Sequence, residues 1–316
     1  MIPLDKPNHS LYYMPHQAVV REESSTTKLR VVFDASAKTS NGKSLNEVML
    51  VGPRLQKDIF DIICKWRSWQ YVVSADIEKM YRQVKISESD QNYQSINLLQ
   101  LQLQETANQI GITKQLHKII KDDFYMDDLL SGADSIEECQ NMYVELKTHL
   151  QNVGFPLRKW LSNNNEISKH FINRNPNDVV DINSKESIKT LGLQWDPEGD
   201  CFKFSINASN TSEPTKRIVL STIAKIYDPL GWLSPIVIVS KLLMQQLWLD
   251  KNKWDENLKN EEIVIWNKFL SKLSSIQEEI KIPRWIKTTN LNKLVLHGFA
   301  DASDKAYAAV VYLVIN

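Results

Sequence analysis

The segment 124–132, FYMDDLLSG, decides how this chain is interpreted. Apolar and aromatic residues flank an adjacent acidic pair, Asp127 and Asp128. Two adjacent carboxylates repel each other, and an apolar setting makes the repulsion worse. The pattern predicts a β-hairpin over 124–130 with the acidic pair at its tip. A divalent cation held between the two carboxylates would remove their repulsion.

A third carboxylate is expected close to this pair. The segment 71–87, YVVSADIEKMYRQVKIS, predicts an apolar strand that runs into Asp76, then a tight turn and a short strand over Arg82–Ile86. Such a strand can lie beside the 124–130 hairpin in one sheet, and three carboxylates at adjacent strand ends suit two-metal phosphoryl transfer. An Asp pair in a turn also serves to cap a helix or to solvate a bend, so both interpretations stay open.

Hydrophobic spacing and turn residues predict the other elements. A helix is expected after Pro53, with apolar residues at helical spacing up to Trp66. A second helix is expected from Ser135, with a capping box to Glu138, and it ends at Gly154. The remaining predictions are a hairpin of Ala18–Arg21 and Lys28–Asp34, a mostly helical pattern over 88–120, a linker or surface loop over 160–186, a hairpin over 188–206, two helices broken at 228–231, a helix over Asn260–Ile280, and two apolar strands around Asp301.

Composition excludes several classes of protein. The chain has 316 residues, and Lys and Arg (38) balance Asp and Glu (38), so nucleic acid or membrane binding needs a local patch. Its 3 Cys are far apart, which favours reduced thiols and predicts an intracellular, cytoplasmic protein. No apolar run is long enough for a membrane span, and the first residues do not have the pattern of a signal peptide, so we expect no membrane partner.

Several motifs, in order, resemble one family. FYMDDLLSG is similar to the Y-x-D-D motif of reverse transcriptases, and VVSADIEKMYRQVKI is similar to the motif that precedes it. KLRVVFDAS resembles a fingers segment, and KTLGLQWD resembles the primer-grip hairpin. YYMPHQAVVRE, SLNEVMLVGPRLQKDIFDII, IYDPLGWLSPI and FADASDKAYAAVVYL together resemble the pol polyprotein of BEL/Pao long-terminal-repeat retrotransposons, in a truncated copy that ends in the first part of a ribonuclease H domain.

The resemblance implies roles for individual residues. The catalytic metal ligands, for Mg²⁺ or Mn²⁺, would be Asp76, Asp127 and Asp128. The incoming nucleotide would contact Lys28, Arg30 and Tyr81. The primer would contact Tyr125, Met126, Leu191 and Gly192. Asp301 would be the first ribonuclease H carboxylate. Each of the contact residues also has a structural alternative. Tyr81 would be a core aromatic on a strand, and Lys28 and Arg30 would lie on an exposed hairpin face. Tyr125 and Met126 would serve in plain packing, and Leu191 and Gly192 would form an ordinary hairpin.

The resemblance also implies an α+β right-hand polymerase. Its parts would be fingers (1–70), a shortened palm (71–160), thumb and connection (161–285) and an incomplete ribonuclease H-like strand pair (290–316). The partners would be an RNA or DNA template-primer and deoxynucleoside triphosphates. The most basic stretch, Lys203–Lys253, has 7 Lys and Arg against 3 Asp and Glu, and it would line the nucleic-acid channel. A solvated helix face is the alternative for that stretch.

Two departures from the family pattern bear on activity. The interval between Asp76 and Asp127 is shorter than in the family, and a Gln- and Leu-rich segment over 95–118 replaces the Gly- and Pro-containing floor under the base pair. Loss of positioning alone lowers a rate by orders of magnitude, so we expect an impaired polymerase. The sequence after Asp301 supplies no further strands of a ribonuclease H site, and we expect no ribonuclease activity from this chain alone.

Three functional hypotheses follow. The first is metal-dependent RNA-directed DNA synthesis at Asp76, Asp127 and Asp128. The second is a non-catalytic remnant that binds nucleic acid in a salt-sensitive manner. The third is a different Mg²⁺-dependent phosphoryl-transfer enzyme, which the absence of a Gly-rich phosphate loop disfavours.

Overall fold

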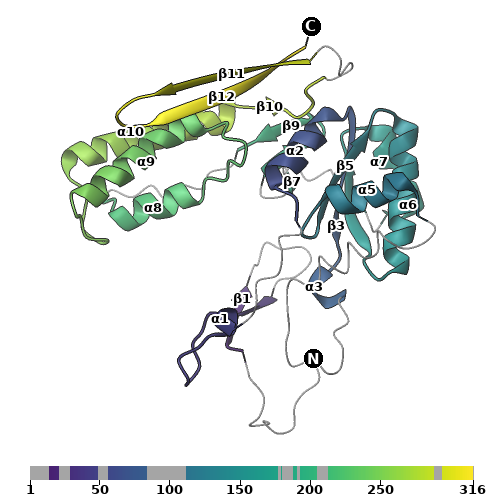
Figure 1. The fold of residues 1–316 in the computed structure, drawn as a ribbon, viewed down its shortest axis with the longest axis horizontal. Coiled ribbons are helices and arrows are strands. Elements are labelled where there is room, and N and C mark those ends of the chain that lie inside the picture. The colour runs from purple at the N-terminus through teal and green to yellow at the C-terminus, as the bar shows by residue number, and fades with distance from the viewer. Residues whose placement is uncertain are drawn as a thin grey trace. The chain divides into compact units, whose positions relative to one another are not determined.

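The computed structural model describes two compact units of the chain (Figure 1). One unit contains Met1–Leu55 and Lys79–Glu105, and the other contains Gln56–Glu78 and Thr106–Asn316. Each unit is described by itself, and the four-part division into fingers, palm, thumb and ribonuclease H segment stays a prediction. The described residues are 14–20, 29–48, 56–83, 112–176, 179, 188–190, 193–204, 213–287 and 294–315.

The first unit contains the predicted N-terminal hairpin. Strands β1 (His16–Val20) and β2 (Leu29–Phe33) pair antiparallel. Two short helices, α1 (Leu45–Val48) and α3 (Met80–Gln83), belong to the same unit. The predicted strand over Arg82–Ile86 is wrong for Arg82, which lies in α3. Lys79 has a left-handed backbone (φ 49°) directly before α3, which turns the chain out of the preceding strand.

The second unit is built on a four-stranded antiparallel sheet of order β4-β5-β3-β6. The inner strand β3 (Tyr71–Ile77) is buried over most of its length, as its apolar sequence predicts. The predicted hairpin is formed by β4 (Phe124–Tyr125) and β5 (Asp128–Ala133), and the other edge strand is β6 (Leu157–Ser162). Asp76 lies on β3 and Asp128 on β5, and Asp127 lies in the turn between β4 and β5.

Helix α2 (Ile59–Ser68) covers one face of this sheet. Its buried Trp66 packs with Val72 of β3 and Leu130 of β5 in one hydrophobic cluster. The helix begins where the Asp58 carboxylate accepts a hydrogen bond from the Phe60 amide, which caps its first turn. The predicted helix from Pro53 is therefore wrong over 56–58, which precede the first turn of α2, and Pro53 itself lies outside the described residues.

Two helices, α6 (Ile136–Asn152) and α7 (Asn165–Arg174), cover the opposite face. Successive strand residues point to opposite faces, so Trp160 of β6 points away from its neighbour Leu161, which packs against α2. Trp160 instead meets Tyr143 of α6 and Phe171 of α7, with ring centroids 4.7 Å and 5.5 Å away. The predicted linker over 160–186 is therefore wrong for its first half, whose apolar residues complete this core.

The predicted boundaries of α6 are confirmed. Ser135 Oγ accepts a hydrogen bond from the Glu138 amide, and Gly154 has the left-handed conformation (φ 89°) that follows many helix ends. A shorter helix, α5 (Lys114–Asp122), begins at the Thr113 cap and confirms the helical pattern at the end of the 88–120 segment. The rest of that segment, 88–111, lies outside the described residues.

A second antiparallel sheet has the order β10-β9-β8-β7. The predicted hairpin over 188–206 is present as β8 (Leu193–Asp196) and β9 (Cys201–Lys203), and β7 (Ile188–Thr190) and β10 (Ile282–Pro283) flank it. Trp195 of β8 meets Trp66 of α2 edge-to-face, with ring centroids 4.8 Å apart. The two sheets therefore share a hydrophobic core through α2.

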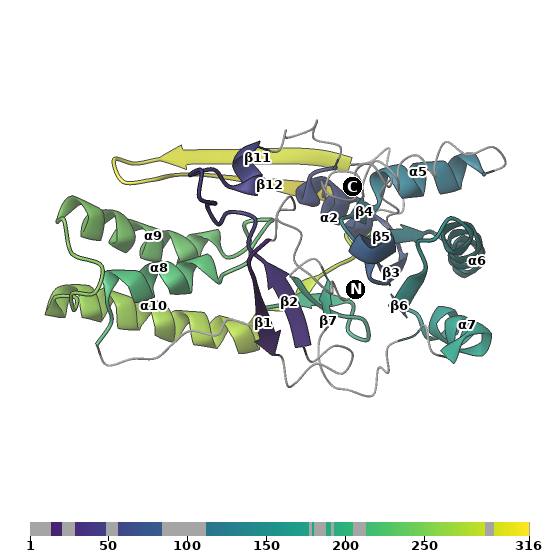
Figure 2. The ribbon, with the colours of Figure 1, turned by 90° about the horizontal axis from the view of Figure 1, so that it is seen from below.

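Three helices lie along the chain between β9 and β10: α8 (Lys216–Ala224), α9 (Ser234–Leu249) and α10 (Asn260–Glu279). Helix α9 packs against both of the others (Figure 2). The predicted break at 228–231 is confirmed, since the Asp228 carboxylate accepts hydrogen bonds from the Trp232 and Leu233 amides (2.9 and 2.7 Å).

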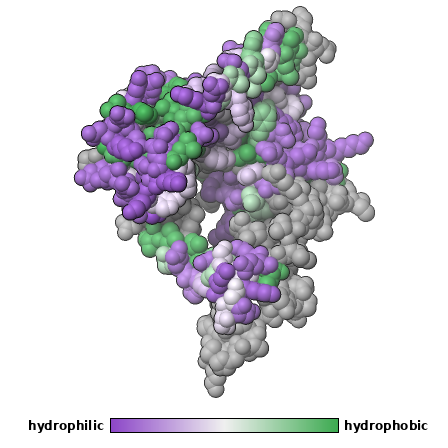
Figure 3. Space-filling model, turned by 60° about the vertical axis from the view of Figure 1, so that its left-hand side comes forward, coloured by the Kyte–Doolittle hydropathy of each residue, from purple (hydrophilic) through white to green (hydrophobic). Residues whose placement is uncertain are grey.

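Hydrophobic side chains are exposed among hydrophilic ones on the face of the molecule shown in Figure 3. Within the described residues, no helix is both long and apolar enough for a membrane span.

The C-terminal hairpin confirms the two predicted apolar strands. Strands β11 (Leu294–Ala302) and β12 (Tyr307–Ile315) pair antiparallel along their whole length. Both faces carry exposed hydrophobic side chains, among them Leu296 and Val311 on one face and Phe299 on the other.

Candidate carboxylate site

The acidic pair is held by a two-residue turn between β4 and β5. Met126 has a left-handed backbone (φ 55°), a conformation used at the first loop position of two-residue hairpins. The Ile77 amide donates to the Asp127 carbonyl oxygen (2.8 Å), which ties this turn to the end of β3. The predicted position of the pair at the hairpin tip is therefore confirmed.

Strand register brings the three predicted carboxylates to one end of the sheet. Asp128 of β5 lies directly opposite Asp76 of β3, and side chains directly opposite each other share a face. Burial raises the pKa of the Asp127 carboxyl, and two effects of Asp76 raise that pKa further: its negative charge and the hydrogen bond that its carboxylate accepts from protonated Asp127. The Asp127 amide and the Lys159 ammonium act in the opposite direction. The carboxyl groups of Asp76 and Asp127 therefore lie within interaction distance of each other.

A lysine on the neighbouring strand contacts this pair. Lys159 of β6 donates from Nζ to Oδ2 of Asp76 and forms an ion pair with it. The preceding residue, Arg158, forms an ion pair with Glu78 instead, with 3.0 Å between Arg158 Nε and Glu78 Oε2. Two cations of β6 thus meet two carboxylates at the end of β3.

The chemistry of the donor set suits a divalent cation, but one of the three carboxylates, Asp76, is already paired with Lys159. Carboxylate oxygens are the ligands that Mg²⁺ prefers, and Asp76, Asp127 and Asp128 supply them from adjacent positions. Yet the part of the chain that the structure describes contains no group of three or more His, Cys, Asp or Glu residues placed to hold a metal ion. Lys159 supplies the positive charge at Asp76 in this arrangement.

The other predicted contact residues are only partly described. Tyr125 of β4 packs against the hydrophobic cluster around Trp66, and Met126 is partly exposed in the turn. Arg30 lies on β2 and Tyr81 on α3, both in the first unit, and their side chains are outside the description. Lys28, Leu191 and Gly192 lie outside the described residues, so their roles stay predictions.

Asp301 lies near the end of β11, opposite Ala308 of β12. Its carboxylate accepts a hydrogen bond from the Ala302 amide, and the residue is exposed. The structure therefore does not bring it together with the three carboxylates of the central sheet. Its predicted ribonuclease H role is untested.

A fourth carboxylate supports the hairpin from inside. Asp123 is buried, accepts a hydrogen bond from Ser131 Oγ (2.6 Å) and pairs with Lys65 of α2. Burial raises its pKa, although Lys65 and Ser131 act against that rise. The Leu130 amide donates to the Asp123 carbonyl oxygen (2.9 Å). Asp123 thus links α2 to both sides of the Asp127 turn.

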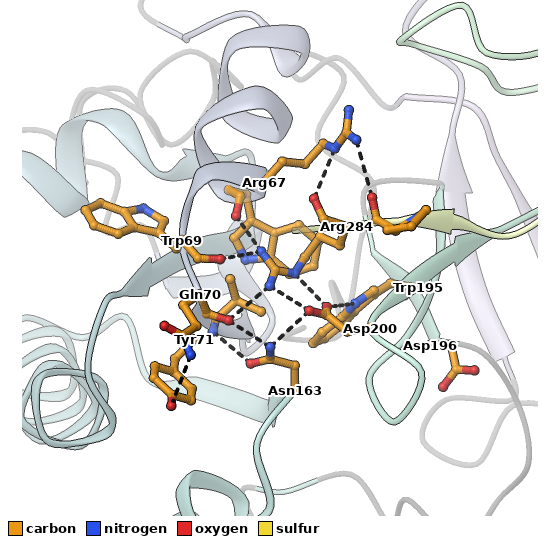
Figure 4. A network of polar contacts seen from close by, with 12 residues as sticks. Arg67, Trp69, Gln70, Tyr71, Asn163, Trp195, Asp196, Asp200 and Arg284 are labelled. Atoms are coloured by element: carbon orange, nitrogen blue, oxygen red, sulfur yellow. Dashed lines mark hydrogen bonds and ion pairs between the residues drawn. The ribbon is translucent and has the colours of Figure 1, made fainter. Parts of the chain in front are cut away.

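The most extensive polar network surrounds Arg284, which follows β10 and is completely buried (Figure 4). Its Nε and one terminal nitrogen donate to the two carboxylate oxygens of Asp200 (2.6 and 2.7 Å). The remaining donors reach the carbonyl oxygens of Trp66, Trp69 and Gln70, at the end of α2. All five N–H donors of the guanidinium group are therefore satisfied.

Two more side chains complete the coordination of Asp200. Asn163 donates to one Asp200 oxygen (3.1 Å) and also to the carbonyl oxygen of Gln70, and Trp195 Nε1 donates to the other Asp200 oxygen (3.2 Å) (Figure 4). Because these residues come from both sheets, the network fixes the second sheet against the end of α2.

Sequence reasoning missed Lys159, Asp123 and the Arg284 network. For Lys159 a signal existed, since Arg158 and Lys159 interrupt an otherwise apolar segment, FPLRKWLS. For Arg284 none existed, because its partners are far away along the chain.

The comparisons with known proteins agree with this description. Residues 215–316 match the family described as the Pao retrotransposon-like RNaseH-like domain. No curated protein matches the chain. Among solved structures, the foamy viral protease-reverse transcriptase dRH in complex with double-stranded DNA is similar, with a TM-score of 0.59 and 13% identity. The match covers 95% of this chain and 49% of the viral chain, so this chain spans about half the length of its structural relative.

The likeness to the viral structure shows a shared fold, and the fold of this chain is mixed α+β. The family match covers α8 to β12, the C-terminal third of the chain. The family match and the shared fold together support a Pao/BEL-type retrotransposon pol protein, as the motifs of the sequence predicted.

Proposed function

We propose that this chain is the RNA-directed DNA polymerase region of a retrotransposon pol protein, with Asp76, Asp127 and Asp128 as its catalytic carboxylates. The observation that supports this proposal best is the register of β3 and β5, in which Asp128 lies opposite Asp76. The carboxyl pair of Asp76 and Asp127 adds to it. Nucleic acid is the proposed partner, because the structural relative is a complex with double-stranded DNA.

The residues of the chain would divide the work at this site. Met126 and the Ile77 amide hold the turn, so that Asp127 is presented beside Asp76. Asp123 holds the base of the hairpin. Asp76, Asp127 and Asp128 would bind Mg²⁺ or Mn²⁺, which when bound supplies positive charge for a nucleoside triphosphate. Deoxynucleoside triphosphates and a primer 3′-hydroxyl are the proposed substrates.

The second candidate is a nucleic-acid-binding protein without catalysis. Two observations favour it. Lys159 forms an ion pair with Asp76, and the described residues contain no cluster of side chains arranged to hold a metal ion. Its binding would depend on phosphate contacts and would weaken steeply with salt. The basic stretch Lys203–Lys253, which includes α8 and α9, is the proposed contact surface.

Primer extension separates the two candidates. The chain is incubated with an RNA template, a DNA primer, deoxynucleoside triphosphates and Mg²⁺, beside a variant carrying Asp127→Asn and Asp128→Asn. Extension by the wild type and not by the variant supports the polymerase. Folded wild-type protein that binds template-primer without extending it contradicts the polymerase and supports the second candidate.

The variant needs a control for folding. Asn retains the size of Asp but not its charge, so the near-ultraviolet circular dichroism of the variant should match that of the wild type. Asp134→Asn, one residue beyond β5, is a matched substitution outside the site, and it should leave extension unchanged.

A further inference from the structure

A β-bulge in β6 lies next to Lys159, the residue whose ammonium group contacts Asp76. On β3, Ser74 and Asp76 are two residues apart, but their partners on β6, Leu161 and Arg158, are three residues apart. The extra residue on β6 shifts the register, so that Arg158 and not Lys159 lies opposite Asp76. Bulges next to functional sites commonly redirect a side chain in this way.

The backbone of Lys159 is left-handed, with φ 57°. A residue with a Cβ pays for this conformation, and such outliers persist where the surrounding structure holds them in place, often at functional sites. The side chain at this left-handed position carries the ammonium group that contacts the Asp76 carboxylate. The bulge and the ion pair are separate observations that point to the same side chain.

We propose that Lys159 is an internal cation that closes the carboxylate site, and that it must leave Asp76 before a divalent cation can bind there. The ammonium group neutralises the carboxylate that the cation needs, and both occupy the same oxygen atom, Oδ2 of Asp76. The inference rests on the proposed function of the three carboxylates, and it adds a competition at one of them.

The side chains permit such an exchange. The Lys159 side chain is 54% exposed and can move into solvent, whereas Asp76 is 22% exposed and belongs to the central strand. A partly exposed ion pair is weak, which suits a group that has to be displaced. The neighbouring pair of Arg158 and Glu78 is independent of Asp76, so β6 keeps an ionic contact with the end of β3 when Lys159 leaves.

The first test measures binding of Mn²⁺ by the electron paramagnetic resonance of the free ion, which requires no turnover. Lys159→Met removes the ammonium group, and Lys159→Gly removes it while suiting the left-handed backbone. Both variants should bind Mn²⁺ roughly threefold more tightly than the wild type, the scale set by a weak ion pair. Arg158→Met removes a charge from the adjacent residue and should change the affinity less.

The second test reports on displacement itself. The rate of acetylation of Lys159 by an N-hydroxysuccinimide ester is measured by mass spectrometry with and without Mg²⁺, relative to Lys169, an exposed lysine of α7. Mg²⁺ should accelerate modification of Lys159 and not of Lys169. The acceleration should be lost in the Asp127→Asn, Asp128→Asn variant.

The results separate this inference from the proposed polymerase. Tighter Mn²⁺ binding by both Lys159 variants, with faster acetylation in Mg²⁺, supports the inference even if no primer is extended. Equal affinity in the wild type and both variants overturns it, as does absence of Mn²⁺ binding in all of them, because Lys159 then does not keep the cation out. An acetylation rate that does not respond to Mg²⁺ also overturns it.

Discussion

The buried guanidinium of Arg284 shows how a single residue can hold two sheets together. A charge removed from water is costly unless it is paired and fully hydrogen-bonded. Arg284 meets that condition with Asp200 and three backbone carbonyl groups. The network therefore matters most for stability when it is broken, because loss of either Arg284 or Asp200 leaves the other charge buried without its partner.

We expect Arg284→Met to lower the free energy of unfolding by about 3 kcal/mol, as found for broken buried ion pairs. Arg217→Met is the matched control, because Arg217 also forms a two-bond pair with an aspartate, Asp255, but at the surface. That variant should unfold at nearly the wild-type urea concentration. Equal losses in the two variants would contradict the role assigned to burial.

Asp123 predicts a pH dependence of stability. Because its pKa is raised, the folded state holds the proton more tightly than the unfolded state. Between the ordinary aspartate pKa and the raised value, the free energy of unfolding therefore falls as pH rises. Asp123→Asn cannot titrate, so its stability relative to wild type should increase with pH across this window. Urea unfolding of the wild type and of Asp123→Asn across this pH window measures the difference, and a constant difference would contradict the raised pKa.

At the scale of elements, the pairing of β3 with β5 depends on one glycine. A Cβ at Gly132 would lie 2.5 Å from the Tyr71 carbonyl oxygen and 2.7 Å from Trp69 Cβ. Backbone cannot yield as a flexible side chain does, so the strands would have to separate. This contact lies at the opposite end of β5 from the carboxylates, and it sets how closely β5 approaches β3.

Gly132→Ala should therefore lower the free energy of unfolding by about 2 kcal/mol, within the range for overpacking. Gly298→Ala in β11 is the control, because nothing lies within 4 Å of a Cβ at that position. It should change stability by less than about 0.5 kcal/mol. Guanidinium unfolding of both variants measures the difference, and similar small losses would contradict the close approach.

The elements differ in how far the sequence predicts them. Helix α6 was predictable because its cap, its apolar spacing and its terminal glycine all agree. The Asp127 hairpin was predictable from its apolar flanks. Helix α7 was missed because polar and Asn-rich residues surround Phe171, whose burial depends on Trp160 and Tyr143 from other elements.

The candidate site was predictable as a set of residues but not as an arrangement. Strand order and register, which place Asp128 opposite Asp76, follow once the hairpin pairs with β3. The bulge next to Lys159 adds a single residue to β6, and no local pattern specifies it. Long-range partners such as Arg284 and Asp200 are set by tertiary packing alone.

At the scale of the whole molecule, the balanced net charge gives little repulsion between copies of the chain. Under that condition, exposed hydrophobic surface governs association. The β11–β12 hairpin is exposed on both faces, and its strands pair with each other only within the described sheets. Unpaired strand edges beside apolar faces favour strand addition between copies.

We therefore expect the chain to self-associate through this hairpin, and a charge on it to oppose that association. Val311→Lys should shift sedimentation toward the monomer at a given protein concentration. Val264→Lys in α10 is the matched control, because both valines are 66% exposed and only Val311 lies in the hairpin. If both variants sediment like the wild type, or if Val264→Lys has the larger effect, the hairpin is not the associating surface.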